Sequence, residues 1–208
     1  MRELPHRQNP LLRISYSLIA PIYDFFIELP MREARKQSLA ALPVNETRHV
    51  LISGVGTGLD LPMLPRMHRY TALDFNPAML SRARPRAGGL EIEFTLGDSM
   101  ALPFADASFD HVVLHLIVAV VPQSEKCLSE AARVLKPGGT IVLFDKFLKP
   151  GQRAPLRRIM SPLTGRFATR TNVVFEEILL AAPSLQVVSD VPMLGGSWFR
   201  AIVLRKKA

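Results

Sequence analysis

The amino-acid sequence predicts an α/β fold: a mostly parallel sheet of seven strands, closed by an antiparallel C-terminal hairpin and covered by helices on both faces. Through the middle of the chain, short apolar runs rich in β-branched residues alternate with helical patterns, which indicates βαβ units. Near the C-terminus, only a short link containing proline and glycine separates two apolar runs, which favours a hairpin. No internal repeat or low-complexity linker interrupts this order, so the 208 residues are expected to form one domain.

The individual elements are expected at the following positions. Five strands precede the hairpin, at His49–Ser53, Tyr70–Asp74, Glu91–Thr95, His111–His115 and Thr140–Phe144. Three helices lie between them, at Leu59–Leu64, Pro77–Arg84 and Ser124–Leu135. The hairpin strands are Leu185–Val191 and Trp198–Leu204. Strands joined by helices pair in parallel, whereas strands joined by a tight link pair antiparallel.

The residues before the first strand form a different kind of segment. In the run LLRISYSLIAPIYDFFIELP, apolar residues recur three or four positions apart, at Leu11, Ile14, Leu18, Ile22, Phe25 and Leu29. That spacing marks one helix face, which Pro21 divides into two short helices. Residues 1–45 are therefore expected to form a helical lid, which either packs only on its own domain or also touches a membrane. The remaining divisions are a core at 46–148, a basic segment at 149–183 and the closing hairpin at 184–208.

The net charge of +8 calls for an anionic partner or surface. The excess gathers between Lys146 and Phe175, where bases occur without any acid: Lys146, Lys149, Arg153, Arg157, Arg158, Arg166 and Arg170. Such a run is either a solvated face or a surface that meets phosphates.

Compartment and membrane topology follow from the apolar stretches and the cysteine. The most apolar stretch, Val112–Val121, contains His115 and is about half as long as a membrane-spanning helix. No secretory signal is visible at the N-terminus. The single cysteine, Cys127, excludes an intramolecular disulfide and is expected to pack as a small apolar residue. We therefore expect a cytoplasmic protein, at most peripheral on the inner face of a membrane.

The strongest chemical signal is a glycine-rich turn. Residues Val50–Leu59 read VLISGVGTGL, a strand running into G-x-G-x-G and then a helix. Glycines at such a turn let the backbone approach a nucleoside ligand closely. Asp74 comes twenty residues after Gly54 and ends the next strand, where a carboxylate can accept hydrogen bonds from ribose hydroxyls. Alternatively Asp74 caps the helix that begins at Pro77, although Asn76 is better placed for that.

A third acidic position follows the third strand, in Gly97-Asp98-Ser99-Met100. A carboxylate here can accept a hydrogen bond from an adenine amino group, or the segment is only a surface turn.

Taken together, GVGTGLDLP, ALDFNPAML, GDSMALPFADASFD and RVLKPGGTIVL resemble the class I S-adenosylmethionine-dependent methyltransferases, a Rossmann-like family. More narrowly, the chain is similar to the group of ubiquinone/menaquinone-biosynthesis C-methyltransferases and bacterial phospholipid N-methyltransferases. The resemblance covers roughly Tyr16–Leu148. Three features look most like the phospholipid enzymes: Tyr16 with Ala20-Pro21-Ile22-Tyr23-Asp24, then Val120-Val121-Pro122, and finally Asp145-Lys146-Phe147.

The resemblance implies S-adenosyl-L-methionine as cofactor, S-adenosyl-L-homocysteine as its product, and no metal. It places Gly54, Gly56 and Gly58 at the methionine half, Asp74 at the ribose, Phe75 and Met79 against the adenine, Asp98 with Ser99 and Met100 at the adenine amino group, and His115 and Leu116 near the sulfonium. One position departs from the family. An acid that helps to anchor the charged end of the cofactor usually stands two residues before the first glycine, and this chain has Ile52 there.

Three residues are candidates for a catalytic role. Methyl transfer is an in-line displacement at an activated carbon, so alignment of the reactants can supply roughly 7–11 kcal/mol. No acid–base dyad stands out, and His115 is either the group that takes a proton from an amine or a core-packed histidine. Tyr16 and Tyr23 either face a cationic sulfonium or ammonium group or pack within the lid.

These observations predict a methyltransferase that N-methylates phosphatidylethanolamine or a related headgroup. An anionic membrane surface explains both the amphipathic N-terminus and the basic segment, because each Lys or Arg there contributes about 1 kcal/mol. The alternatives are C-methylation of a quinone precursor, methylation of a soluble small molecule, or a catalytically silent S-adenosylmethionine-binding protein, which Ile52 would favour.

Nucleic acid is disfavoured as the methyl acceptor. The fourth strand ends in Leu114-His115-Leu116-Ile117, which lacks the Asn/Asp-Pro-Pro-aromatic motif used on adenine amines. The chain also carries no appended RNA-binding module.

Overall fold

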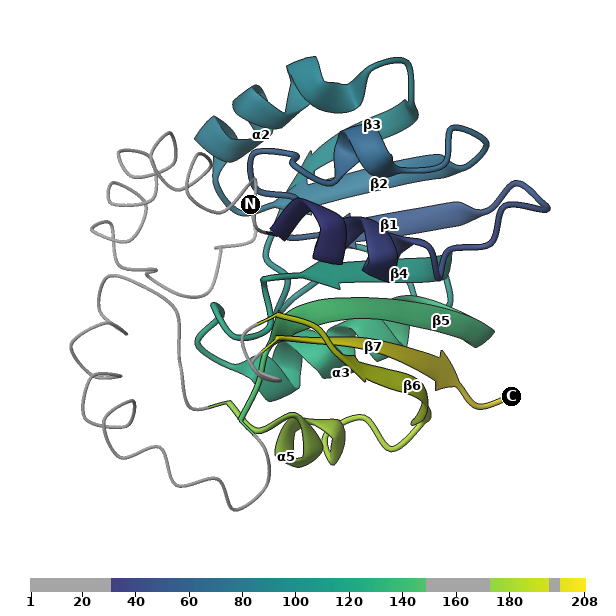
Figure 1. The fold of residues 1–208 in the computed structure, drawn as a ribbon, viewed down its shortest axis with the longest axis vertical. Coiled ribbons are helices and arrows are strands. Elements are labelled where there is room, and N and C mark those ends of the chain that lie inside the picture. Colours follow the sequence, from purple (N-terminus) through teal and green to yellow (C-terminus); the bar gives the residue numbers. More distant parts are fainter. Residues whose placement is uncertain (1–30, 149–172, 195–198) are drawn as a thin grey trace.

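The protein is built on a seven-stranded mixed sheet with strand order β3-β2-β1-β4-β5-β7-β6 (Figure 1). The computed structural model describes residues 31–148, 173–194 and 199–208. The strands are β1 His49–Ser53, β2 Arg69–Asp74, β3 Glu91–Leu96, β4 Phe109–His115, β5 Leu135–Lys146, β6 Leu185–Pro192 and β7 Phe199–Lys206. Strands β1 to β5 pair in parallel, and β7 pairs antiparallel with both β5 and β6. The predicted fold class is therefore confirmed.

The strand order determines where a ligand can bind. From β1 the sheet continues outward to β2 and β3 on one side and to β4 and β5 on the other. In open α/β sheets, ligands bind outside the carboxyl ends of the strands at the point where the strand order reverses. Here that point lies between β1 and β4, and the edge at which the parallel strands end is called the carboxyl edge below.

Two hydrophobic clusters cover the two faces of the sheet. On one face, α3 (Ser124–Val134) and α5 (Phe175–Leu179) pack on the inner residues of β4, β5 and β7. On the other face, a helix at 31–39, the 3-10 helix η1 (Leu61–Met63) and α2 (Pro77–Ala83) pack on β1 and β2. The remaining short element, η2 (Arg84–Ala87), continues α2. Helices on both faces were expected from the alternating sequence pattern.

The element boundaries agree with the sequence to within a few residues, with two exceptions. The helix expected at Leu59–Leu64 is only the 3-10 turn η1, because Pro65 favours an extended conformation for the residue before it. Accordingly Leu64 has φ −75° and ψ 143°. Strand β5 begins at Leu135, well before the expected start, because this first part pairs with Phe109 ahead of a bulge in the ladder.

Two smaller predictions are also confirmed. Asn76 caps α2, accepting a hydrogen bond from the amide of Ala78 at 3.0 Å. Cys127 is fully buried, and burial raises the pKa of its thiol to about 12, so it packs as an apolar residue. Tyr16, Tyr23 and residues 149–172 of the basic segment lie outside the described residues. Among the helices that are described, none has the length and apolar character needed to cross a membrane.

The core packing yields a stability prediction. Leu143 lies in β5 between β4 and β7 with 0% of its surface exposed, so Leu143→Ala should lower the free energy of unfolding by about 2–5 kcal/mol. The control is Leu180→Ala, at a residue 80% exposed, which should change the unfolding free energy by less than about 0.5 kcal/mol. Urea titrations of both variants measure the difference. Equal unfolding midpoints for the two variants would contradict this assignment of the core.

Candidate functional site

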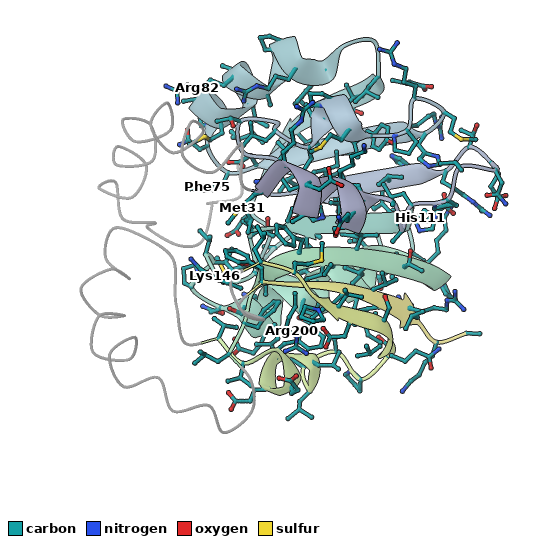
Figure 2. All side chains as sticks on the ribbon, viewed as in Figure 1. Met31, Phe75, Arg82, His111, Lys146 and Arg200 are labelled. Carbon is teal, nitrogen blue, oxygen red and sulfur yellow. The ribbon has the colours of Figure 1, made fainter. Side chains whose placement is uncertain are left out.

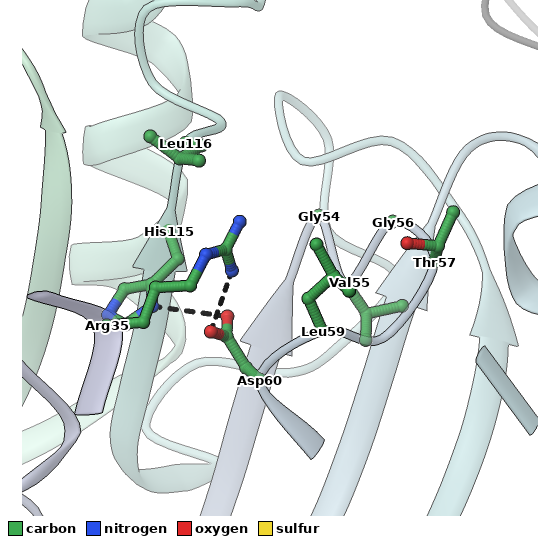
Figure 3. Close-up of a pocket in the computed structure, with 9 residues that line it drawn as sticks. All are labelled: Arg35, Gly54, Val55, Gly56, Thr57, Leu59, Asp60, His115 and Leu116. Atoms are coloured by element: carbon green, nitrogen blue, oxygen red, sulfur yellow. Dashed lines mark hydrogen bonds and ion pairs between the residues drawn. The ribbon is translucent and has the colours of Figure 1, made fainter. Parts of the chain in front are cut away.

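A pocket opens at the carboxyl edge, where β1 and β4 end (Figure 3). Its lining comes from the helix at 31–39, the glycine turn with its following residues, and the end of β4: Arg35, Gly54, Val55, Gly56, Thr57, Leu59, Asp60, His115 and Leu116. Figure 2 shows Phe75 and Lys146 at this same edge of the sheet, whereas His111 lies at the opposite edge.

The glycine turn is held tightly at its first residue. The amides of Gly54 and Val55 both donate to the carbonyl of Leu73 in β2, at 2.8 and 2.9 Å. Gly54 has φ +78°, and a Cβ there would come within 2.7 Å of the Ile117 side chain. Only glycine fits this position, because the left-handed backbone and the close neighbour both exclude a side chain.

The two later glycines of the turn differ in what surrounds them. Gly56 has φ +55°, and a Cβ added there would meet no atom within 4 Å. Gly58 instead packs inward, where a Cβ would lie 2.9 Å from Leu61 and 3.0 Å from Ala83. Gly56 therefore leaves open space in the pocket, as a backbone that approaches a ligand must.

Asp74 braces the glycine turn from the end of β2. Its Oδ2 accepts a hydrogen bond from the amide of Gly56 at 2.8 Å, and its Oδ1 accepts one from the amide of Asn76 at 2.9 Å. Burial raises the pKa of Asp74, while these backbone amides act in the opposite direction. Phe75 and Met79, which follow Asp74 in the chain, are half-buried and buried respectively.

The turn after β3 is tied to the end of β1. Asp98 accepts a hydrogen bond from the amide of Met100 at 2.9 Å. The buried hydroxyl of Ser53 donates to that of Ser99 at 2.8 Å. Asp98, Ser99 and Met100 thus lie just after the end of β3, and Ser99 reaches the end of β1.

Three charged or polar side chains form a buried cluster in the wall of the pocket. Nη1 of Arg35 donates to Oδ1 of Asp60 at 2.7 Å, and Nδ1 of His115 lies 3.1 Å from Oδ2 of the same carboxylate (Figure 3). Nε2 of His115 lies 3.1 Å from the hydroxyl of Ser38. The side chains of Arg35, Asp60 and His115 are 9%, 8% and 2% exposed. Burial opposes ionisation of Asp60, but the neighbouring His115 and Arg35 hold its pKa well below the usual range.

The structure brings some of the predicted site residues together and leaves others apart. Gly54, Gly56, His115 and Leu116 line one pocket. Gly58, Asp74, Phe75, Met79, Asp98, Ser99 and Met100 lie on adjoining elements and do not line that pocket. In the described part of the chain, no group of three or more His, Cys, Asp or Glu side chains could hold a metal ion.

Sequence reasoning missed Arg35, Ser38 and Asp60. A signal existed for the first two, because Arg35 and Ser38 share the buried face of their helix with Ala34 and Leu39. A charged residue on an apolar helix face needs a partner. Asp60 stands directly after the glycine turn in GTGLDLP, but only the fold shows that it faces Arg35.

A third buried carboxylate fixes the loop after β4. Asp145, at the end of β5, is 1% exposed. It accepts hydrogen bonds from the amides of Ala119 and Lys146 at 2.9 and 2.8 Å. Burial nevertheless raises the pKa of Asp145 to about 6.

The chain is similar in sequence to known methyltransferases. The family described as "Methyltransferase domain" matches residues 51–143. A phosphatidylethanolamine N-methyltransferase of Cereibacter sphaeroides is 33% identical over 191 residues, which cover 89% of this chain and 93% of that protein. A demethylmenaquinone methyltransferase of Thermus thermophilus is 34% identical over 140 residues, covering 62% of this chain and 63% of that one.

The fold also matches solved structures. The methyltransferase in a complex with the Trm112 activator of Haloferax volcanii superposes with a TM-score of 0.75 at 22% identity. The match covers 93% of this chain and 98% of that one. At this level of identity the likeness supports the fold alone.

The glycine turn generates a binding prediction with a matched control. Ala at a left-handed position costs about 1–2 kcal/mol of stability, so Gly56→Ala and Gly138→Ala should be destabilised similarly. Both positions have positive φ, and a Cβ at either meets no atom within 4 Å, but only Gly56 lines the pocket. Calorimetric titration with S-adenosylhomocysteine should therefore show a loss of affinity of roughly tenfold or more for Gly56→Ala alone. Equal affinities for the two variants would remove Gly56 from the binding site.

Asp145 generates a prediction about pH. Its pKa is about 6 in the fold against 3.8 for the free side chain, so between these values folding takes up a proton. The free energy of unfolding of the wild type, minus that of Asp145→Asn, should therefore fall as pH rises from 4 to 6, by about 3 kcal/mol at most. Urea titrations across this range measure the difference. A difference independent of pH would show that Asp145 is ionised in the folded protein.

Proposed function

Since the chain belongs to the class I S-adenosylmethionine-dependent methyltransferases, we propose that it N-methylates the headgroup of phosphatidylethanolamine or a related phospholipid. The extent of the sequence matches carries this proposal. The relative named phosphatidylethanolamine N-methyltransferase is matched over 89% of the chain, and the menaquinone relative over 62%. The family match at 51–143 spans β1 to β5, which all such enzymes share.

The distribution of charge supports a lipid acceptor. The acid-free run of bases between Lys146 and Phe175 begins at the last residue of β5, at the carboxyl edge of the sheet. A surface of this kind would dock on anionic lipid, where each base contributes about 1 kcal/mol. The amphipathic pattern before residue 30 would add apolar contact with the same interface.

The chemistry asks mainly for alignment. When bound, S-adenosylmethionine supplies a methyl carbon that is already activated by the sulfonium. The residues of this chain then have to hold the acceptor nitrogen in line with that carbon and exclude water. The closely packed turn at Gly54 and the buried brace from Asp74 suit this role, because both fix the backbone around the pocket.

The contacts of His115 favour a positioning role over direct proton transfer. Asp60 lies beside Nδ1 and Ser38 beside Nε2, so both ring nitrogens already face protein groups. On this proposal His115 orients Asp60, and the acceptor amine reacts in its unprotonated form after losing its proton to solvent.

A labelling assay tests the acceptor. Purified protein is incubated with S-adenosylmethionine labelled in the methyl group and vesicles of phosphatidylcholine and phosphatidylglycerol, with or without phosphatidylethanolamine. We expect label in the monomethyl lipid only when phosphatidylethanolamine is present. The rate should fall as salt is added, because salt screens the basic surface from the anionic lipid.

Two variants and one further acceptor make the assay decisive. Gly56→Ala should lose most of the incorporation, which excludes a contaminating enzyme of the host, whereas Gly138→Ala should keep it. Incorporation into demethylmenaquinone instead of lipid would refute the proposal in favour of quinone C-methylation. Binding of S-adenosylhomocysteine without incorporation into either acceptor would also overturn it.

A further inference from the structure

The Arg35–Asp60 ion pair lies in the pocket wall next to the glycine turn rather than sealed inside the core. A buried pair of this kind is a weak contributor to stability, because removing both charges from water offsets their attraction. Because the pair lies in the pocket wall, its two charges are placed to interact with a bound molecule.

Arg35 keeps hydrogen-bonding capacity that Asp60 does not use. One terminal nitrogen donates to Asp60, while Nε is buried and has no hydrogen-bond partner among the described residues. Figure 3 shows the second terminal nitrogen directed away from Asp60, on the side of Leu116. A guanidinium offers five N–H donors in a planar fork that matches a carboxylate. The arrangement is complementary to an anionic group in the pocket.

The carboxylate of Asp60 is fixed and ionised in the same place. His115 lies 3.1 Å from Oδ2 and Arg35 2.7 Å from Oδ1, so the group is oriented from both sides. Strand β1 offers no negative charge here, because Ile52 is 2% exposed and belongs to the apolar cluster beneath the turn. Among the described residues that line the pocket, Asp60 is the only carboxylate.

One cation and one anion side by side match a ligand that itself carries both charges close together. The α-amino-acid end of S-adenosylmethionine has a carboxylate and an ammonium on one carbon. We propose that Arg35 binds this carboxylate and that Asp60 accepts a hydrogen bond from the ammonium, so Asp60 supplies the negative charge that position 52 lacks. The inference rests on membership of the methyltransferase family and is independent of the acceptor.

Ligands that differ only at this end test the proposal by calorimetry, without any turnover. S-adenosylhomocysteine carries the amino-acid group, and 5′-methylthioadenosine has the same nucleoside and thioether without it. In Arg35→Gln and in Asp60→Asn, affinity for S-adenosylhomocysteine should fall roughly 10- to 100-fold, as expected for loss of a charged hydrogen bond. Affinity for methylthioadenosine should stay within about threefold of wild type.

A third ligand separates the two roles. Decarboxylated S-adenosylmethionine keeps the ammonium but lacks the carboxylate. Its binding should be insensitive to Arg35→Gln and weakened by Asp60→Asn. Arg35→Lys should recover part of the affinity for S-adenosylhomocysteine, because the positive charge is kept although the fork is lost.

Arg200→Gln is the matched control. Arg200 is as buried as Arg35 and pairs with Asp190 and Glu176, but it does not line the pocket. This variant should be less stable than the wild type. The ratio of its affinities for S-adenosylhomocysteine and methylthioadenosine should stay at the wild-type value.

Removing one partner of a buried pair can prevent folding. In that case the double variant Arg35→Gln/Asp60→Asn, which leaves no unpaired charge, is measured instead. A parallel loss of affinity for both ligands, or no loss for either, would overturn the proposal. Failure of the lipid assay would leave these affinities unaffected.

Discussion

The close approach between Gly54 and Ile117 is the constraint on which the site depends. A Cβ at Gly54 would lie 2.7 Å from that side chain, so the turn after β1 and the loop after β4 meet at van der Waals distance. The amides of Gly54 and Val55 also share one acceptor, the carbonyl of Leu73. Three neighbouring strand ends are thereby held in one arrangement. Packed interiors transmit small changes of volume, so the pocket keeps its shape only while this contact is intact.

Among the described residues, three carboxylates are buried: Asp60, Asp74 and Asp145. They differ in the groups that surround them, and therefore in the direction in which their pKa is shifted. Asp60 faces Arg35 and His115, which hold its pKa low, so it is an anion in the wall of the pocket. Asp74 and Asp145 accept hydrogen bonds from backbone amides, and burial raises the pKa of each. These two act as braces for loops. Of these three described carboxylates, only Asp60 combines a fixed negative charge with a place in the pocket wall.

Local patterns predicted much of the fold because the local preferences agree with the packing. Strand β1 has the expected bounds, and the cap at Asn76 follows from its position before Pro77. The helix predicted after the glycine turn is cut to a single 3-10 turn, because Pro65 forces the residue before it into an extended conformation. The pairing of Arg35 with Asp60 could not be predicted, since residues 25 apart in the chain meet only through the fold. A charge on a buried helix face indicates that a partner exists, but not which residue it is.

The backbone just after β4 is strained, and the cause is the same close approach of β1 and β4 that requires glycine at position 54. Leu116 has φ +55°, a left-handed conformation that costs a residue with a side chain about 1–2 kcal/mol. The amide of Leu116 donates to the carbonyl of Phe144 at 2.8 Å, and that of Ala119 to Asp145 at 2.9 Å, so β5 holds both ends of the turn. The left-handed step lets Leu116 line the pocket while the next residue packs on Gly54. Strain at Leu116 and the need for glycine at position 54 are therefore two consequences of bringing the ends of β1 and β4 together around the pocket.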